Sequence, residues 1–231
     1  MRGLRRRGTG SLDFRQPDGR LPSNGAFATL VRERRPDGGM KATLRVTGGT
    51  KVRQRLYSLD ISVVRPTPHM VREALGSILR DRLPGARCLD LFAGTGAVGI
   101  EFLSRGAGLC VFVDNSGAAC RTIEKNLVKL ELTGVGHVIH SDAVQAIRRL
   151  GTRDEAFDVI FADPPYRYEL TPQLLRALED ASIAKPDGVV IVETSKRERL
   201  DDAYGSFELV DRRAYGQTVL HFFKPSTKRG G

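Results

Sequence analysis

The chain has 231 residues, of which 40% are hydrophobic and 28% are charged, and its formal net charge is +10. This balance predicts one large folded domain with appendages and excludes wholesale disorder. No stretch reaches the roughly 20 apolar residues that span a bilayer, and no apolar run of the secretory type follows the first arginines. We therefore expect no membrane partner. Three cysteines without a CxxC pair, Cys88, Cys110 and Cys120, predict free thiols in a reducing cytoplasm and no metal site.

The charge is distributed unevenly along the chain. Residues 1–39 carry +5 and residues 40–85 carry +6, whereas residues 86–223 carry −4 and the tail from Lys224 carries +3. Basic segments on either side of a nearly neutral core suggest a polyanionic partner such as nucleic acid. A solvated basic face explains the charge equally well, so both interpretations stay open at this point.

Composition divides the chain into three parts. Residues 1–39 hold seven Gly and three Pro, which predicts a disordered basic arm. Residues 40–66 alternate apolar and basic side chains around Gly48-Gly49, which predicts a basic β-hairpin. Residues 67–231 form the third part. It opens with a helix, because Thr67 is suited to the N-cap position and Pro68 to the first helical position.

The third part predicts an α/β fold in which strands and helices alternate. The pattern is typical of a doubly wound, Rossmann-like sheet whose strands are mostly parallel. Two final strands joined at Gly216 must pair antiparallel, as a terminal hairpin. Ligands of such sheets bind at the carboxyl ends of the strands, where the strand order reverses. We expect strands at 88–92, 109–113, 137–140, 157–162, 189–193, 206–214 and 217–223, and helices at 97–105, 116–131, 143–150 and 172–182.

A glycine-rich loop follows the first strand. Gly94, Gly96 and Gly99 have the G-x-G-x-x-G spacing, and Asp114 ends the next strand, where a carboxylate can accept both hydroxyls of a ribose. Both features predict an adenosine-containing cofactor. Asp90, before the loop, would repel a pyrophosphate but suits the ammonium and sulfonium groups of S-adenosylmethionine. The pattern D-x-F-x-G-x-G resembles motif I of class I methyltransferases. In that family the position of Asp142, after the third strand, contacts adenine.

A second motif, Asp163-Pro164-Pro165-Tyr166, follows the fourth strand. The two prolines stiffen the turn and have no N–H group of their own. Asp163 adds a carboxylate acceptor and Tyr166 an aromatic ring, which together can hold a planar aromatic amine. The motif resembles the [DNS]-P-P-[YF] sequence of methyltransferases that act on exocyclic nitrogens. Catalysis would consist mostly of positioning the amine for in-line attack.

One family matches the chain over about residues 43–223. The segments Arg65-Pro66-Thr67 and Val71-Arg72-Glu73-Ala74-Leu75 resemble the R-P-T-x-x-x-V-R-E-x-L signature of RsmD-type guanine-N2 methyltransferases of bacterial 16S rRNA. Further matches are Arg45–Gly49, Leu103–Ala107 and Lys125–Leu127. The resemblance implies that the cofactor contacts Asp90, Phe92, Ala93, Gly94, Thr95, Gly96, Asp114, Asp142 and Ala143. It implies that guanine contacts Asp163, Pro164, Pro165 and Tyr166.

The expected RNA contacts are basic residues of the hairpin and of the segment after it: Lys51, Arg53, Arg55, Arg65 and Arg72. For Arg65 and Arg72 a structural ion pair is an equal alternative. We expect a cytoplasmic monomer whose substrate is 16S rRNA within a small-subunit assembly. Three rival functions stay open: methylation of adenine N6 or of a protein glutamine, RNA binding without catalysis, and nicotinamide-dependent oxidoreduction.

Overall fold

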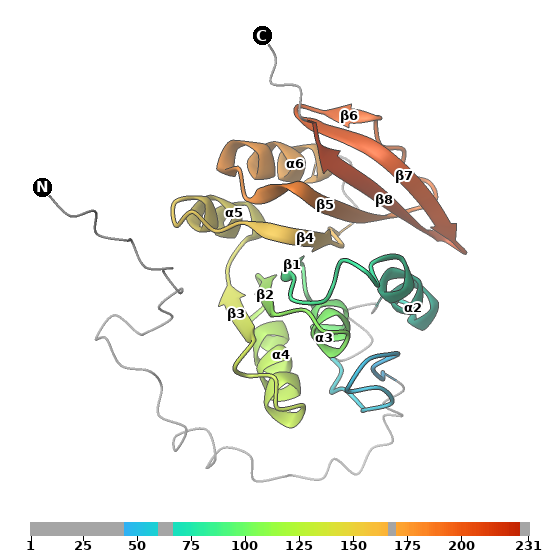
Figure 1. The fold of residues 1–231 in the computed structure, drawn as a ribbon, viewed down its shortest axis with the longest axis vertical. Helices are drawn as coiled ribbons and strands as arrows, with labels where there is room; N and C mark the ends of the chain where they lie inside the picture. The colour runs from blue at the N-terminus through green and yellow to red at the C-terminus, as the bar shows by residue number, and fades with distance from the viewer. Residues whose placement is uncertain (1–43, 60–66, 166–169, 227–231) are drawn as a thin grey trace, which may run out of the picture. The chain divides into compact units, whose positions relative to one another are not determined.

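The strands of the structure, a computed structural model, form one sheet in the order β3-β2-β1-β4-β5-β8-β7-β6 (Figure 1). The structure describes residues 44–59, 67–165 and 170–226, and all of them lie in one unit, Ala42–Gly231. The predicted arm 1–39, Arg65 and Tyr166 lie outside the described residues. The strand bounds are β1 Arg87–Leu91, β2 Leu109–Asp114, β3 Gly136–His140, β4 Phe157–Ala162, β5 Ala184–Ser195, β6 Ala203–Tyr204, β7 Phe207–Tyr215 and β8 Thr218–Pro225.

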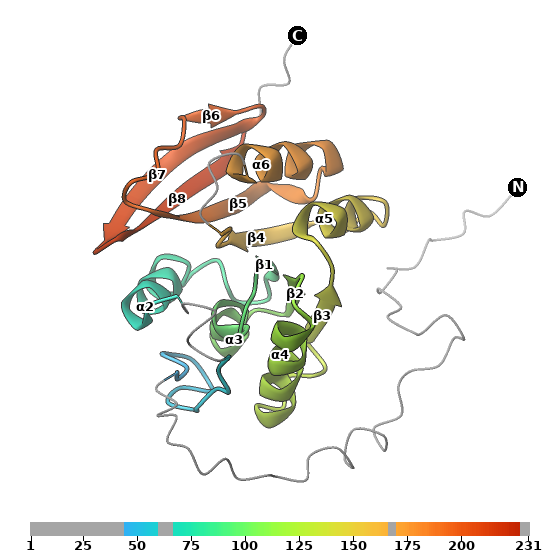
Figure 2. The ribbon, with the colours of Figure 1, turned by 180° about the vertical axis from the view of Figure 1, so that it is seen from behind.

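Helices cover both faces of this sheet. Figures 1 and 2 show α2, α3 and α4 on one face and α5 and α6 on the other. Side chains of a strand point alternately to the two faces, so Cys88 packs in the core under α2–α4, whereas Leu89 packs under α5 and α6. The helix bounds are α2 His69–Ile78, α3 Ala97–Ser104, α4 Gly117–Lys129, α5 Ala143–Gly151 and α6 Leu170–Ala181.

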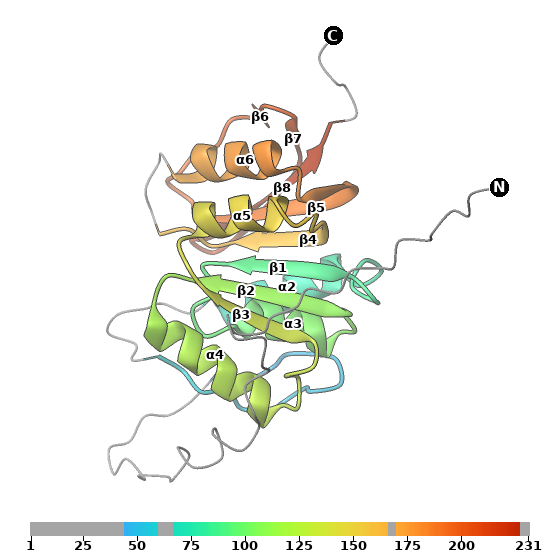
Figure 3. The same cartoon turned by 90° about the vertical axis from the view of Figure 1, so that its left-hand side faces the viewer.

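The strand order reverses between β1 and β4. Strands β1–β5 are parallel, and β1 pairs with β2 on one side and with β4 on the other. Figure 3 shows β1, β2 and β4 running side by side, with α5 and α6 beside them. The loops that follow β1 and β4 therefore flank the switch point, where open α/β sheets bind ligands. The predicted α/β architecture is confirmed, including the terminal hairpin of β7 and β8.

Two strands differ from the expected pattern. β5 begins at Ala184, ahead of the expected start, because a register shift between Phe157 and Val159 of β4 accommodates Pro186 and Gly188 as a bulge. The two-residue strand β6 pairs with the start of β7 and extends the antiparallel part of the sheet. The sequence did not predict β6, because two residues are too few to show an alternation of apolar and polar side chains.

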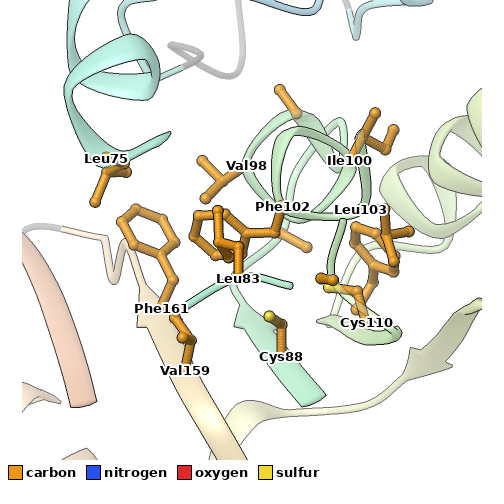
Figure 4. Packing of buried hydrophobic residues seen from close by; sticks show 14 of the residues in the cluster. Leu75, Leu83, Cys88, Val98, Ile100, Phe102, Leu103, Cys110, Val159 and Phe161 are labelled. Carbon is orange, nitrogen blue, oxygen red and sulfur yellow. The ribbon is translucent and has the colours of Figure 1, made fainter. Parts of the chain in front are cut away.

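The core under α2–α4 joins the sheet to α3. Figure 4 shows Phe161 of β4 pointing toward Leu75 of α2, with Val98 and Phe102 of α3 beside them. All four side chains are buried. Because α3 is buried along its whole length, the loop that precedes it is anchored by apolar packing at its helical end.

The predicted basic hairpin is present as a short antiparallel turn. Arg45 and Arg55 form its bridge, and Val46 exchanges backbone hydrogen bonds of 2.9 and 3.0 Å with Arg53 and Gln54. Leu44, Val46 and Leu56 are buried, whereas Arg45, Arg53 and Arg55 are exposed. Its Gly48-Gly49 turn docks on the end of α3. Gly49 has φ 78°, and a Cβ atom there would overlap the Ser104 carbonyl.

Candidate active site

The glycine-rich loop turns sharply between β1 and α3. Phe92, Gly94 and Gly96 all have positive φ, at 60°, 55° and 75°. Glycine adopts such angles freely, but at Phe92 they carry strain of the kind that persists at functional sites. Gly96 is the N-cap of α3 and offers no side-chain acceptor to the helix. The N-terminal amides of α3 are thus presented at the carboxyl end of β1.

Asp90 and Gly99 fasten α3 to the sheet beneath this loop. A Cβ atom at Gly99 would overlap the ring of Phe112 and the sulfur of Cys110, so only glycine allows the helix so close. The Gly99 amide donates to Oδ2 of Asp90 at 2.9 Å. Asp90 is only 1% exposed, so it lies below the loop and not at the open edge of the sheet.

Asp114 holds the glycine loop from the neighbouring strand. Its Oδ2 accepts from the Gly94 amide and its Oδ1 from the Ser116 amide, both at 2.8 Å. Each carboxylate oxygen has two lone-pair directions, so both oxygens keep the capacity to accept a second hydrogen bond. The geometry therefore fits the predicted contact with a pair of ribose hydroxyls.

Asp163 is the third member of a cluster of acidic residues at the switch point, together with Asp90 and Asp114. It follows β4, and its amide donates to the Leu91 carbonyl of β1 at 3.4 Å. Burial raises the pKa of Asp163 to about 7. Burial also raises the pKa of Asp90 to about 7; the Gly99 amide opposes this rise, and the negative charges of Asp114 and Asp163 add to it. Carboxylates that resist ionisation in this way would be stabilised by a cation placed among them. A sulfonium or ammonium group fits this site, and a pyrophosphate does not.

The other predicted cofactor residues at this edge of the sheet differ in exposure. Asp142 is exposed and caps α5, with its Oδ1 accepting from the Gln145 amide at 3.1 Å. Ala143 is buried in the core under α5, and Ala93 and Thr95 are buried in the loop. A contact from these three would have to come from the backbone. Their cofactor roles stay predictions.

The proline motif is described only in part. Pro164 is buried and Pro165 is exposed directly after Asp163. Tyr166, the predicted stacking residue, lies outside the described residues. The described part places an acceptor and a rigid turn at the carboxyl end of β4, next to the glycine loop.

The predicted RNA contacts divide into exposed and buried residues. Arg53 and Arg55 are exposed on the hairpin, as is Arg45, which the site prediction left out. Lys51 is half-buried, with its Nζ 3.9 Å from Glu131. The predicted RNA contact of Arg72 is wrong, because Arg72 is 2% exposed and cannot reach an RNA phosphate in this conformation. Its Nη1 donates instead to the Arg45 carbonyl at 2.8 Å and holds the hairpin against α2.

Asn126 is a site residue whose role the sequence did not reveal. It is fully buried on α4, and its Nδ2 donates to the Thr95 carbonyl of the glycine loop at 3.0 Å. The same side chain exchanges two hydrogen bonds with the backbone of Tyr57, at 2.7 and 3.1 Å. The available signal was an amide among the apolar positions Ile123, Leu127 and Leu130 of the helix.

Neither a metal site nor a membrane span is found among the described residues. In the ranges 44–59, 67–165 and 170–226, no group of three or more His, Cys, Asp or Glu side chains could hold a metal ion. Within the part of the chain that the structure describes, no helix combines the length and apolar composition of a membrane span.

Known proteins share both the sequence and the fold. A family model described as conserved hypothetical protein 95 matches residues 44–224. YlbH of Bacillus subtilis, described as a candidate rRNA methyltransferase, is 34% identical over 81% of this chain and 100% of its own. Ribosomal RNA small subunit methyltransferase D of Escherichia coli K12 is 29% identical over 83% of this chain and 94% of its own. The solved structure of yhhF from Escherichia coli, described as a candidate methyltransferase, matches at TM-score 0.69 and 26% identity, covering 80% of this chain and 99% of its own. The chain therefore belongs to the conserved hypothetical protein 95 family, the RsmD-type class I methyltransferases.

Proposed function

We propose that this protein transfers the methyl group of S-adenosylmethionine to the exocyclic N2 amino group of a guanine in 16S rRNA. The observation that carries the proposal is the acidic group Asp90, Asp114 and Asp163 around the glycine loop at the switch point. Family membership and the names of the relatives support the choice of substrate.

The bound cofactor would supply a methyl group made electrophilic by the adjacent sulfonium. Asp114 would accept the ribose hydroxyls while continuing to hold the Gly94 amide. Asp90 would act through its charge, from below the loop. Loss of its proton at about pH 7 would increase the attraction for a cation.

Asp163 would orient the nucleophile. An ionised carboxylate can accept an N–H of the guanine amine and so direct the nitrogen lone pair toward the methyl carbon. The methylated nitrogen must then release one proton, and a carboxyl with a pKa of about 7 can take it near neutral pH. Pro164 and Pro165 would stiffen the turn that carries Asp163. Because guanine N2 is enclosed in paired or stacked RNA, the base would be turned out to reach this site, with Tyr166 as its stacking partner.

The basic hairpin favours a nucleic acid over a protein among the amine substrates that an Asp-Pro-Pro motif could hold, and the choice of guanine rests on family membership. Adenine N6 and a glutamine amide present the same N–H geometry to Asp163. Arg45, Arg53 and Arg55, which are all exposed, suit a polyanion and have no evident use for a protein substrate. We include in the proposal a monomeric, cytoplasmic enzyme that acts on rRNA within a small-subunit assembly.

The test uses the full chain, labelled S-adenosylmethionine and small ribosomal subunits that lack the modification. We expect label at N2 of one guanine of 16S rRNA, located by nuclease digestion and mass spectrometry. Naked 16S rRNA is assayed in parallel and is expected to accept less label. Label in adenine or in a ribosomal protein, or no transfer to either RNA substrate, would contradict the proposal.

A further inference from the structure

An exposed aromatic residue stands where the hairpin meets α4. Tyr57 is 49% exposed, yet its backbone is fixed on both sides by the buried Asn126. The Tyr57 amide donates to Asn126 Oδ1 at 2.7 Å, and its carbonyl accepts from Asn126 Nδ2 at 3.1 Å. A rigid backbone that presents an exposed ring loses little entropy when the ring is covered, which favours its use as a binding platform.

One basic side chain lies over this ring, and two more continue along the same helix. Lys129 of α4 places its Nζ 4.7 Å from the ring centroid of Tyr57. Arg121 and Lys125 precede it at four-residue spacing, so the three form one ridge of α4, and all three are exposed. The hairpin contributes Arg45, Arg53 and Arg55 from its exposed face.

The charge of this region is only partly neutralised from within, because Lys51 pairs with Glu131. Residues 44–59 and 117–131 together contain seven basic and two acidic residues. Among the described residues, none of the three hairpin arginines or the three cations of the α4 ridge forms an ion pair. Arg45 and Arg55 stand opposite each other in the bridge, an arrangement in which like charges are destabilising. An anionic partner would relieve this repulsion.

We propose that the hairpin and the α4 ridge form one RNA-binding surface, and that Tyr57 at its centre is the platform for an unpaired base. The inference rests on the proposed function and extends it to a second binding position, separate from the base that is methylated. RNA fits both halves of the surface, because its phosphates match the cations and its unpaired bases stack on aromatic rings. An acidic protein segment would match the cations but would not need the ring.

The experiment measures the affinity of the full chain for unmethylated 16S rRNA at several salt concentrations. Tyr57→Ala should weaken binding by roughly 5- to 150-fold, the range expected when one base no longer stacks on an aromatic ring. Tyr57→Phe keeps the ring and should bind nearly as the parent does. Lys125→Ala with Lys129→Ala should lower the slope of log affinity against log salt by roughly 0.7–0.9 for each phosphate that the variant no longer neutralises.

The matched control is Arg148→Ala with Arg149→Ala on α5, which removes the same charge from exposed positions on the opposite face of the sheet. This pair should leave the salt slope unchanged. If Tyr57→Ala bound RNA as tightly as the parent, Tyr57 would not be a platform for a base. If the α4 and α5 double variants lowered the salt slope equally, the hairpin and the α4 ridge would not form the RNA-binding surface.

Affinity for S-adenosylhomocysteine, measured for every variant, shows that the cofactor site is still folded. For Tyr57→Ala this affinity should equal that of the parent. If the parent methylates small subunits while the Tyr57 and α4 variants bind RNA normally, the inference fails and the proposed function stands. If the parent neither binds nor methylates rRNA, the proposed function itself fails.

Discussion

Two regions of this molecule carry opposite charge and differ in exposure: one is acidic and largely buried, and the other is basic and exposed. At the carboxyl ends of β1, β2 and β4, the acidic residues Asp90, Asp114 and Asp163 gather, and burial raises the pKa of two of them to about 7. On the hairpin and α4, Lys51 pairs with Glu131. Six further cations are exposed and form no ion pair among the described residues: Arg45, Arg53, Arg55, Arg121, Lys125 and Lys129. Burial makes a small number of charges strongly selective for one small cation, whereas exposed charges act together on a large polyanion.

The opposite charges of the two regions would keep a cationic cofactor and a polyanionic substrate at separate sites on one chain. The acidic edge repels phosphates, so RNA backbone should stay on the basic surface and only a base should approach Asp163. Asn126 links the two regions, because it binds the Thr95 carbonyl of the glycine loop and the backbone of Tyr57.

Asp163→Ala should lower kcat by roughly 10²-fold or more, because it removes the acceptor that orients the amine during transfer. Affinity for S-adenosylhomocysteine should be retained, since the glycine loop is untouched. Single-turnover methylation of small subunits measures the first quantity and calorimetry the second. Transfer at the parental rate would mean that the proline motif is only a rigid turn.

Asp114→Ala should weaken S-adenosylmethionine binding by roughly 10²-fold. The change removes a charged acceptor for the ribose and leaves the Gly94 and Ser116 amides without their partner. Asp114→Asn keeps one acceptor oxygen, so its affinity for S-adenosylmethionine should lie between those of Asp114→Ala and the parent. Calorimetric titration measures all three proteins. Equal affinities would remove Asp114 from the cofactor site.

Asn126→Ala should lower the free energy of unfolding by about 1–3 kcal/mol, because it leaves the buried Thr95 carbonyl and the partly buried backbone groups of Tyr57 unpaired. Thr122→Ala is the control. Its hydroxyl donates to the Ala118 carbonyl of the same helix at an exposed position, and its removal should change the stability by no more than about 0.5 kcal/mol. Denaturant unfolding compares the two variants. Similar stabilities would show that the link through Asn126 is not structural.

Binding of S-adenosylmethionine should strengthen as pH rises through about 7, because Asp90 and Asp163 then lose their protons. Between about pH 4 and pH 7 the folded protein keeps protons that the unfolded chain has released, so the stability of the free protein should fall as pH rises over the same window. The affinity ratio of S-adenosylmethionine to S-adenosylhomocysteine isolates the sulfonium. For each of the two carboxyls, this ratio should rise by up to about tenfold per pH unit while the pH is below that carboxyl's pKa. A ratio that does not change with pH would contradict the assignment of Asp90 and Asp163 to the sulfonium.

Much of the fold and the outline of the site could be predicted because both follow from short-range patterns. Alternating strands and helices determine the parallel sheet, so the acid that ends β2 and the acid that follows β4 must lie at its carboxyl edge. The burial of Arg72 could not be predicted, because its partner is a carbonyl of the hairpin 27 residues earlier. The position of Asp90 under α3 depends on the face of β1 from which it points, and the role of Asn126 depends on two segments brought together only by folding.

The separation of the two regions is tested most directly by single-turnover methylation followed as a function of small-subunit concentration. Two variants are compared with the parent: Asp163→Ala, and the combined replacement of Arg45, Arg53 and Arg55 by Ala. We predict that Asp163→Ala lowers the limiting rate without changing the half-saturating concentration. The hairpin variant should raise the half-saturating concentration and leave the limiting rate intact. If both variants changed the same parameter, the acidic edge and the basic surface would not be separate sites.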